Sequence, residues 1–220
     1  MASFKQHINI SVIATGILII PLHSSHILDT NQSIIALFMG LIGGMLPDID
    51  LDYSTPTKLF FGLISIFLPF IILLHIKLSP IYIMALWFAS TVALKFIFFD
   101  TFTALTVHRG IFHTIPMAIF FALISNIISI EVFHLSHTFS LLIGFFIFWG
   151  FIIHLLLDEI YSIDFSGLKI KRSFGTALKL FDLKNKIGSI VLYLLVLGLL
   201  YLYPLDKTLI LKIFHTFKFF

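Results

Sequence analysis

Long apolar runs separated by short polar segments dominate the sequence. A membrane-spanning helix needs about 20 mostly apolar residues, and the chain offers about seven runs near that length. The runs cover residues 8–22, 32–46, 59–75, 81–99, 111–130, 138–160 and 187–203. This pattern predicts an all-α, polytopic helical membrane protein whose membrane-embedded helices pack in one bundle.

The first two runs are short for full spans, so we expect them to be tilted, partly re-entrant or packed as a hairpin. A signal peptide is the alternative for the first run, but no A-x-A-like cleavage site follows it. We expect one membrane-embedded domain over residues 1–204. Residues 205–220 carry Lys207, Lys212 and Lys218 among apolar side chains, which predicts a basic amphipathic tail, with a further partial span as the alternative.

The composition agrees with a bilayer as the solvent. Hydrophobic residues make up 59% of the chain and charged residues 11%, whereas charged residues form about a quarter of a soluble domain. A water-soluble globule and a disordered chain are therefore excluded. The chain has no cysteine, so a metal would have to be held by histidines and carboxylates.

The basic residues predict an orientation. If all the runs span, one side of the membrane holds ten of the 14 basic residues: Lys5, Lys58, Lys95, Arg109, Lys169, Lys171, Arg172, Lys179, Lys184 and Lys186. Six of these ten come from the polar connection at residues 161–186. The positive-inside rule then places the N-terminus in the cytoplasm and the C-terminus outside. We attribute the net charge of +3 to this membrane orientation. We therefore expect membrane lipids rather than nucleic acid as partners.

Ionisable groups at membrane helices are costly and are therefore candidates for function. The same topology places several of them together at the cytoplasmic ends of the runs: His7, Asp48, Asp50, His108, His113, His154 and Asp158. The remaining histidines fall on the opposite side, where we expect ordinary interfacial groups: His23, His26, His75, His134, His137 and His215.

His154 and Asp158 are four residues apart near the end of a long apolar run, and residues four apart share a helix face. They can meet the same ion, and an imidazole with a carboxylate suits zinc, manganese or iron. The alternative is a hydrogen bond between two interfacial side chains.

Gly40, Gly43 and Gly44 lie in the second run, where we expect small residues to allow close packing against a neighbouring helix. Carboxylates alternate after this glycine-rich run, which we expect to end at Pro47. An extended backbone at Asp48, Asp50 and Asp52 would put these side chains on one side, where Asp48 and Asp50 could bind one ion together or two neighbouring ions. A solvated loop is the alternative.

A third group surrounds Gly110. His108 in the loop and His113 on the first turn of the next helix would both point at a site at the helix N-terminus, which favours anions. Arg109 is either a bidentate partner for such an anion or a residue that contacts headgroups.

These motifs, in this order, resemble the YdjM-like family of inner-membrane-associated proteins, also described as membrane-bound metal-dependent hydrolases. The family shows a histidine before an apolar helix, then L-P-D-x-D, H-R-G-x-x-H-[ST] and H-x-x-x-D followed by a glycine. This chain has His7, then the motifs at 46–50, 108–114 and 154–158, and Gly167. The connection at 161–186 is more basic than we expect for the family, and the chain after Lys186 matches nothing in this motif pattern.

The resemblance implies a hydrolase-like site that holds one or two divalent metal ions, most simply zinc, with manganese or iron as alternatives. We expect the metal to activate water for hydrolysis of a phosphoester or ester, in an anionic lipid or another phosphoester substrate. The expected ligands are His7, Asp48, His108, His113, His154 and Asp158. Asp50 is either a bridging ligand or the general base, Arg109 holds the substrate anion, and the patch of Lys169, Lys171 and Arg172 attracts anionic headgroups.

Two other functions use the same residues. A metal or proton transporter would line its path with histidines and aspartates, but near the bilayer midplane. A non-catalytic scaffold would use a structural metal to tie its helices together.

Overall fold

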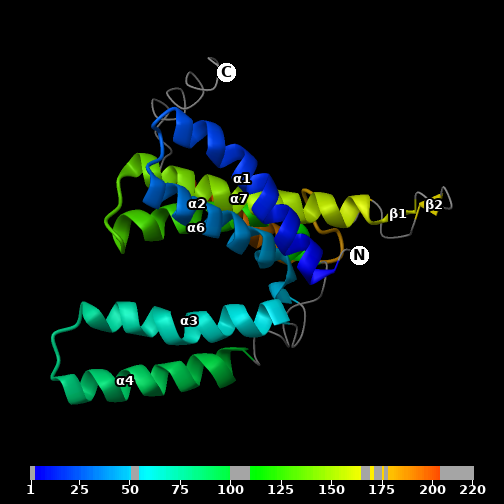
Figure 1. The fold of residues 1–220 in the computed structure, drawn as a ribbon. Helices are drawn as coiled ribbons and strands as arrows, with labels where there is room; N and C mark the ends of the chain where they lie inside the picture. Colours follow the sequence, from blue (N-terminus) through cyan, green and yellow to red (C-terminus); the bar gives the residue numbers. More distant parts are fainter. Residues whose placement is uncertain are drawn as a thin grey trace. The chain divides into compact units, whose positions relative to one another are not determined.

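The structure is a computed structural model that describes residues 3–50, 55–99, 110–164, 169–170, 175 and 178–203. Within these ranges each predicted run corresponds to one α-helix (Figure 1). The helices are α1 (Phe4–Ser24), α2 (Thr30–Met45), α3 (Thr55–Leu74), α4 (Pro80–Val92), α6 (Ile115–Glu131), α7 (His137–Ile160) and α8 (Lys186–Leu202). The predicted all-helical membrane architecture is confirmed.

Short elements complete the described chain. Two 3-10 turns, η1 (Leu46–Asp50) and η3 (Ile111–His113), follow α2 and precede α6, and a π-helical turn, η2 (Ala93–Phe98), extends α4. After α7, the two-residue strands β1 (Ile163–Asp164) and β2 (Lys169–Ile170) pair antiparallel. This small ribbon lies within the long polar connection between α7 and α8.

Polar side chains set the starts of the helices. Each of these residues accepts a hydrogen bond from a backbone N–H of the first turn, which satisfies a donor that the helix itself leaves unpaired. They are Ser3, Asp29, Thr114, Ser136 and Asn185. At Ser3 and Asp29, a glutamine three residues later returns a bond to the cap backbone, so α1 and α2 begin with complete capping boxes.

Five helical segments are long and apolar enough to cross a membrane: Phe4–Ser24, Thr30–Ile49, Thr57–Leu74, Pro80–Ile97 and His137–Ile160. The first two helices are thus longer than their apolar runs. The cap at Ser3 starts α1 before the apolar run begins, and η1 lengthens the second segment. Of the alternatives expected for them, the structure shows the hairpin, because α1 and α2 pack against each other and against α7. The remaining two helices, α6 and α8, have 17 residues each.

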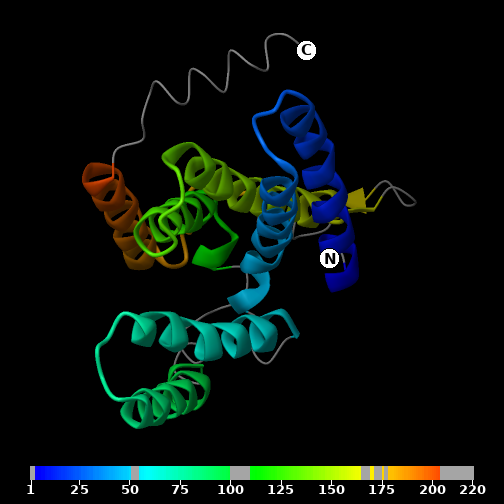
Figure 2. The same ribbon diagram turned by 60° about the vertical axis from the view of Figure 1, so that its left-hand side comes forward.

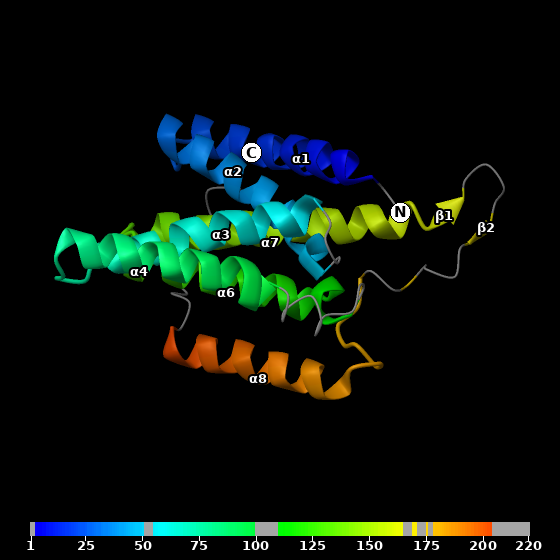
Figure 3. The ribbon, with the colours of Figure 1, turned by 90° about the horizontal axis from the view of Figure 1, so that it is seen from below.

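The chain forms two compact units, Met1–Pro47 with His113–Phe220, and Asp48–Phe112. In the first unit α7 lies in the centre, with α1 and α2 against one side and α6 against another (Figure 2). Figure 3 shows α8 beside α6. The second unit is the antiparallel hairpin of α3 and α4. The predicted domain limits at 204 and 205 stay a prediction, because residues 204–220 lie outside the described part of the chain.

Glycines allow α2 to approach α1 and α7 closely. A Cβ atom at Gly40 would collide with the Thr15 side chain, one at Gly43 with the Ile147 carbonyl oxygen, and one at Gly150 with the Gly40 carbonyl oxygen. These contacts are the close packing of small residues that membrane bundles use. The packing role predicted for the glycines of the second helix is thus observed, and it brings backbone atoms of α2 next to α7.

Candidate metal centre

The site is built on the last turns of α7, where His154 and Asp158 lie one turn apart. Both side chains are buried, with exposed fractions of 0% and 2%. A carboxylate removed from water needs a compensating charge or hydrogen bonds, so the neighbours of Asp158 decide what this pair can do.

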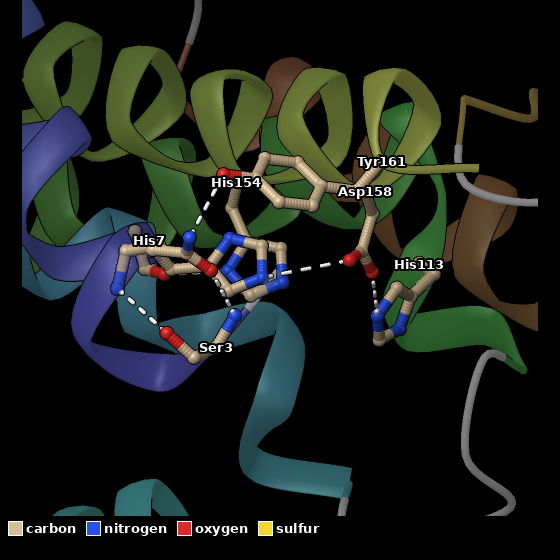
Figure 4. Close-up of polar contacts among 8 residues, drawn as sticks. Ser3, His7, His113, His154, Asp158 and Tyr161 are labelled. Atoms are coloured by element: carbon tan, nitrogen blue, oxygen red, sulfur yellow. Dashed lines mark hydrogen bonds and ion pairs between the residues drawn. The ribbon is translucent and has the colours of Figure 1, made fainter. Parts of the chain in front are cut away.

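His7 reaches the pair from α1. Its Nε2 atom is 3.5 Å from Asp158 Oδ1, and its ring stacks on that of His154 with centroids 3.7 Å apart and planes 10° apart (Figure 4). The cap at Ser3 makes His7 part of α1, whereas the sequence pattern placed it before the helix. The side chain therefore points into the bundle, with an exposed fraction of 3%.

His113 approaches from the side opposite His7. Its Nε2 atom is 3.7 Å from Asp158 Oδ2, and its ring centroid is 5.9 Å from that of His154 at an interplanar angle of 76°. His113 is the last residue of η3, immediately before Thr114, which caps α6. Each oxygen of the Asp158 carboxylate thus faces a different histidine.

The backbone of α2 fixes the tautomer of His154. His154 Nδ1 is 2.7 Å from the Gly44 carbonyl oxygen, and because a carbonyl oxygen only accepts, Nδ1 carries the proton. The lone pair of the ring is therefore on Nε2, on the side of the other ligands. Metal-binding histidines are oriented in this way by a carbonyl or carboxylate on their second nitrogen.

A hydrogen-bond chain ties the start of α1 to the end of α7. The Gln6 side-chain amide donates to the Tyr161 hydroxyl at 2.9 Å, while its carbonyl oxygen accepts from the Ser3 backbone at 2.6 Å. Figure 4 shows Ser3 and Tyr161, the two ends of this chain of hydrogen bonds, beside the histidines. Gln6 precedes His7, and Tyr161 follows Asp158 by three residues. These hydrogen bonds therefore hold the start of α1, which carries His7, next to the end of α7, which carries Asp158.

The arrangement fits a divalent metal ion. Ligand atoms of His7, His154 and Asp158 all lie within 4.8 Å of one another. Two ligands that are each about 2.1 Å from a tetrahedral zinc ion lie about 3.4 Å apart, close to the 3.5 Å between His7 Nε2 and Asp158 Oδ1. A charge-assisted hydrogen bond would be shorter, at about 2.7–2.9 Å.

The burial of His7 supports the same conclusion. His7 Nδ1 is buried and has no hydrogen-bond partner among the described residues. An unpaired polar atom in a buried site is costly, and an ion bound at Nε2 of the same ring would offset that cost, although it leaves Nδ1 itself unpaired. Imidazole and carboxylate together are the donors that zinc, manganese and iron accept.

Asp48 is assigned to the second compact unit. It is buried in η1, and its backbone carbonyl accepts a hydrogen bond from the Thr57 hydroxyl at 3.1 Å, but its role as a ligand stays a prediction. The side chain of Asp50, together with His108 and Arg109, lies outside the described residues.

The extended backbone predicted for the alternating aspartates is wrong at Asp48 and Asp50. Both belong to the 3-10 turn η1, whose backbone winds at three residues per turn instead of extending. The glycine-rich α2 also ends at Met45 rather than at Pro47, because η1 continues the segment with tighter winding.

Sequence reasoning missed three residues that support the cluster. Gly44 was assigned to packing alone, although its carbonyl orients His154. Gln6 and Tyr161 were not identified at all. Gln6 carried a usable signal, since Ser3 and Gln6 have the spacing of a capping box, whereas no local pattern links Gln6 to Tyr161.

Comparison with protein families agrees with the motif pattern. The model of the YdjM inner membrane protein family matches residues 1–210, so the match continues well beyond the last motif and beyond Lys186. No curated protein and no solved structure matches the chain.

Proposed function

The chain belongs to the YdjM inner membrane protein family, and we propose that it is a membrane-bound, metal-dependent hydrolase. The observation that supports the proposal is the buried cluster in which His7, His113 and His154 surround the Asp158 carboxylate. An apolar membrane protein gains nothing from burying four such groups unless they bind something or hold helices together.

We assign the residues as follows. His7, His154 and Asp158 hold the ion, with His113 on the second oxygen of Asp158 and Asp48 as a further ligand. A divalent ion, when bound, polarises a phosphoryl or carbonyl group and lowers the pKa of water. Asp50 acts as the general base that takes a proton from the attacking water.

Anion binding is assigned to the motif around Arg109. Its guanidinium group would bind a phosphoryl oxygen pair in bidentate geometry. Lys169, Lys171 and Arg172 would attract anionic headgroups toward the site. Removing Arg109 should therefore weaken substrate binding more than metal binding.

The position of the cluster favours a lipid substrate. His7 lies in the first turn of α1 and Asp158 in the last turn of α7, so the ligands lie near helix ends. In a bilayer these ends approach the headgroup region, where the ester and phosphoester bonds of phospholipids are located. This placement also speaks against a transporter, whose ion site is expected near the midplane.

A structural metal in a non-catalytic scaffold is the second candidate. It is favoured by the origin of the ligands. His7 from α1 and His113 from the residue before the α6 cap both contact Asp158 of α7. An ion there would tie the helices of the first unit together. In that case, loss of the ligands lowers the yield of folded protein as much as any function.

Metal content is the first test. Wild-type protein and the variants His154→Ala and Asp158→Ala are purified in detergent, and bound metal is measured by mass spectrometry at matched folded yield. His137→Ala is the matched control, since His137 is an exposed histidine at the other end of the same helix. We expect about one or two ions per chain in wild type and control, and loss in both site variants. A clean wild-type protein without metal would contradict the proposal.

Hydrolysis is the second test. Phospholipids and synthetic phosphodiesters and esters are screened with the ion found in the first test. Turnover that disappears in Asp158→Ala but not in His137→Ala supports the hydrolase. Stoichiometric metal without turnover on any of these substrates supports the scaffold.

A further inference from the structure

The α3–α4 hairpin contains a groove of about 220 Å³ at the end where α3 begins and α4 ends. Its lining includes Lys58, Gly62, Leu63 and Ile66 from α3, Thr91 from α4 and Lys95 from η2. The groove lies entirely within the second unit and shares no residue with the metal centre. It is therefore a separate feature of the molecule.

Two features of the hairpin form the groove. A hydrogen bond sets the distance between the two helices, and one turn away α3 has a glycine, which leaves the space between the helices unfilled. The Trp87 indole N–H donates to the Ile66 backbone carbonyl at 2.9 Å, which fixes the spacing of the pair. About one turn nearer the start of α3, a Cβ atom on Gly62 would meet no atom within 4 Å. The backbone at Gly62 is therefore the floor of the groove, and the space above it is open.

Two ammonium groups flank this space. Lys58 lies one turn before Gly62, and Lys95 lies one turn after Thr91 on the opposing helix, so both line the same groove. Both side chains are exposed. Lys95 is carried by η2, and π-helical turns are rare and occur frequently at functional sites.

A hydroxyl inside the groove adds a donor. Thr91 Oγ1 is buried and has no hydrogen-bond partner among the described residues, whereas the neighbouring Ser65 hydroxyl is satisfied by the Gly62 carbonyl at 2.9 Å. The walls are apolar and exposed, with Leu63 at 48% and Ile66 at 43%. Positive charge and a free hydroxyl therefore lie beside apolar surface at the end of a membrane hairpin.

From this arrangement we infer that the groove binds the headgroup of an anionic phospholipid. The phosphate lies between Lys58 and Lys95, the Thr91 hydroxyl donates to a phosphate or glycerol oxygen, and the acyl chains leave the groove past Leu63 and Ile66 into the bilayer. Basic pockets between membrane helices on the cytoplasmic side bind anionic headgroups in this way, and the positive-inside count predicts that side for both lysines.

The size of the groove agrees with this occupant. Pockets that enclose a drug-sized molecule measure about 300–1,000 Å³. A groove of about 220 Å³ has room for a headgroup but not for acyl chains, which would stay in the bilayer. The inference does not depend on the proposed hydrolase activity, since it concerns binding in the other unit.

Lipid retention tests the inference. The full chain is purified in detergent micelles that contain either phosphatidylglycerol or phosphatidylcholine with the same acyl chains, and bound lipid is counted by native mass spectrometry. We expect wild-type protein to prefer phosphatidylglycerol by about thirtyfold, because both lysines are attracted to its net negative headgroup, whereas the choline group of phosphatidylcholine offsets the phosphate charge. The double variant Lys58→Gln, Lys95→Gln should lose this preference, and Gly62→Phe should block the groove with both charges in place.

Matched controls separate the groove from general effects. Lys77→Gln with Lys186→Gln removes the same charge from two exposed sites away from the groove. Gly198→Phe adds the same ring at another helical glycine whose Cβ would meet nothing within 4 Å. The controls should keep the preference of wild type. Equal retention of both lipids by wild type, an unchanged preference in either groove variant, or equal losses in the controls would each overturn the inference.

Discussion

The imidazole rings of His7 and His154 lie face to face, with centroids 3.7 Å apart, although His7 belongs to α1 and His154 to α7. Ligand atoms of both rings and of Asp158 lie within 4.8 Å of one another, so the two stacked histidines can share one ion. Asp158, in contact with His7, supplies the negative charge.

Removal of the metal should destabilise the protein. A ligand present at about 100 times its dissociation constant stabilises the folded state by about 2.7 kcal/mol, so a chelator should lower the thermal unfolding midpoint in detergent and added zinc should restore it. The midpoint of Asp158→Asn should respond to neither treatment, because that variant lacks the charged ligand. A wild-type midpoint that is insensitive to chelator would argue against a bound ion.

Gly150→Ala should be destabilising. Its Cβ would collide with the Gly40 carbonyl oxygen and approach the Gly44 nitrogen, so α2 must move away from α7, at a cost of about 1–3 kcal/mol. Because the Gly44 carbonyl orients His154, metal affinity should fall as well. Thermal unfolding and metal titration measure the two effects.

Gly198→Ala is the matched control for that experiment. A Cβ at Gly198 meets nothing within 4 Å, and replacing glycine by alanine inside a helix stabilises it by about 0.5–1 kcal/mol. The control should therefore unfold at an equal or higher temperature than wild type. Equal destabilisation by both substitutions would show that the close approach at Gly150 is not the cause.

The Gln6–Tyr161 hydrogen bond should couple the two ends of the site. Tyr161→Phe removes the acceptor oxygen and should cost about 0.5–1.5 kcal/mol of unfolding free energy. A double-mutant cycle with Gln6→Ala isolates the pair from the bond that Gln6 also makes to Ser3. We expect a coupling energy above about 0.5 kcal/mol, and additive effects would mean that the bond does not contribute.

Asp50→Asn tests the assignment of the general base. The amide cannot accept the proton of the attacking water, so turnover should be abolished while expression and membrane insertion stay at wild-type levels. Metal content separates the two roles considered for Asp50: a base leaves it unchanged, and a bridging ligand lowers it. Unchanged turnover would remove Asp50 from the site.

The sequence alone determined the helices and one half of the site. A bilayer leaves no water to satisfy backbone groups, so long apolar runs must become helices, and each run did so in the described chain. The shared face of His154 and Asp158 follows from helical spacing. Local patterns failed where the winding changed, as at Asp48 and Asp50, since the same residues fit an extended strand or the 3-10 turn that forms.

Tertiary structure decided which distant groups meet. His7, His113 and the Gly44 carbonyl reach the α7 pair from segments far apart in the sequence. Their distances depend on how closely the helices pack, and that approach is set by backbone contacts at glycines such as Gly43 and Gly150. Apolar periodicity predicts that a helix face is buried. It does not predict the partner helix or the offset of the two helices along their axes, because many pairings of apolar faces bury a similar area.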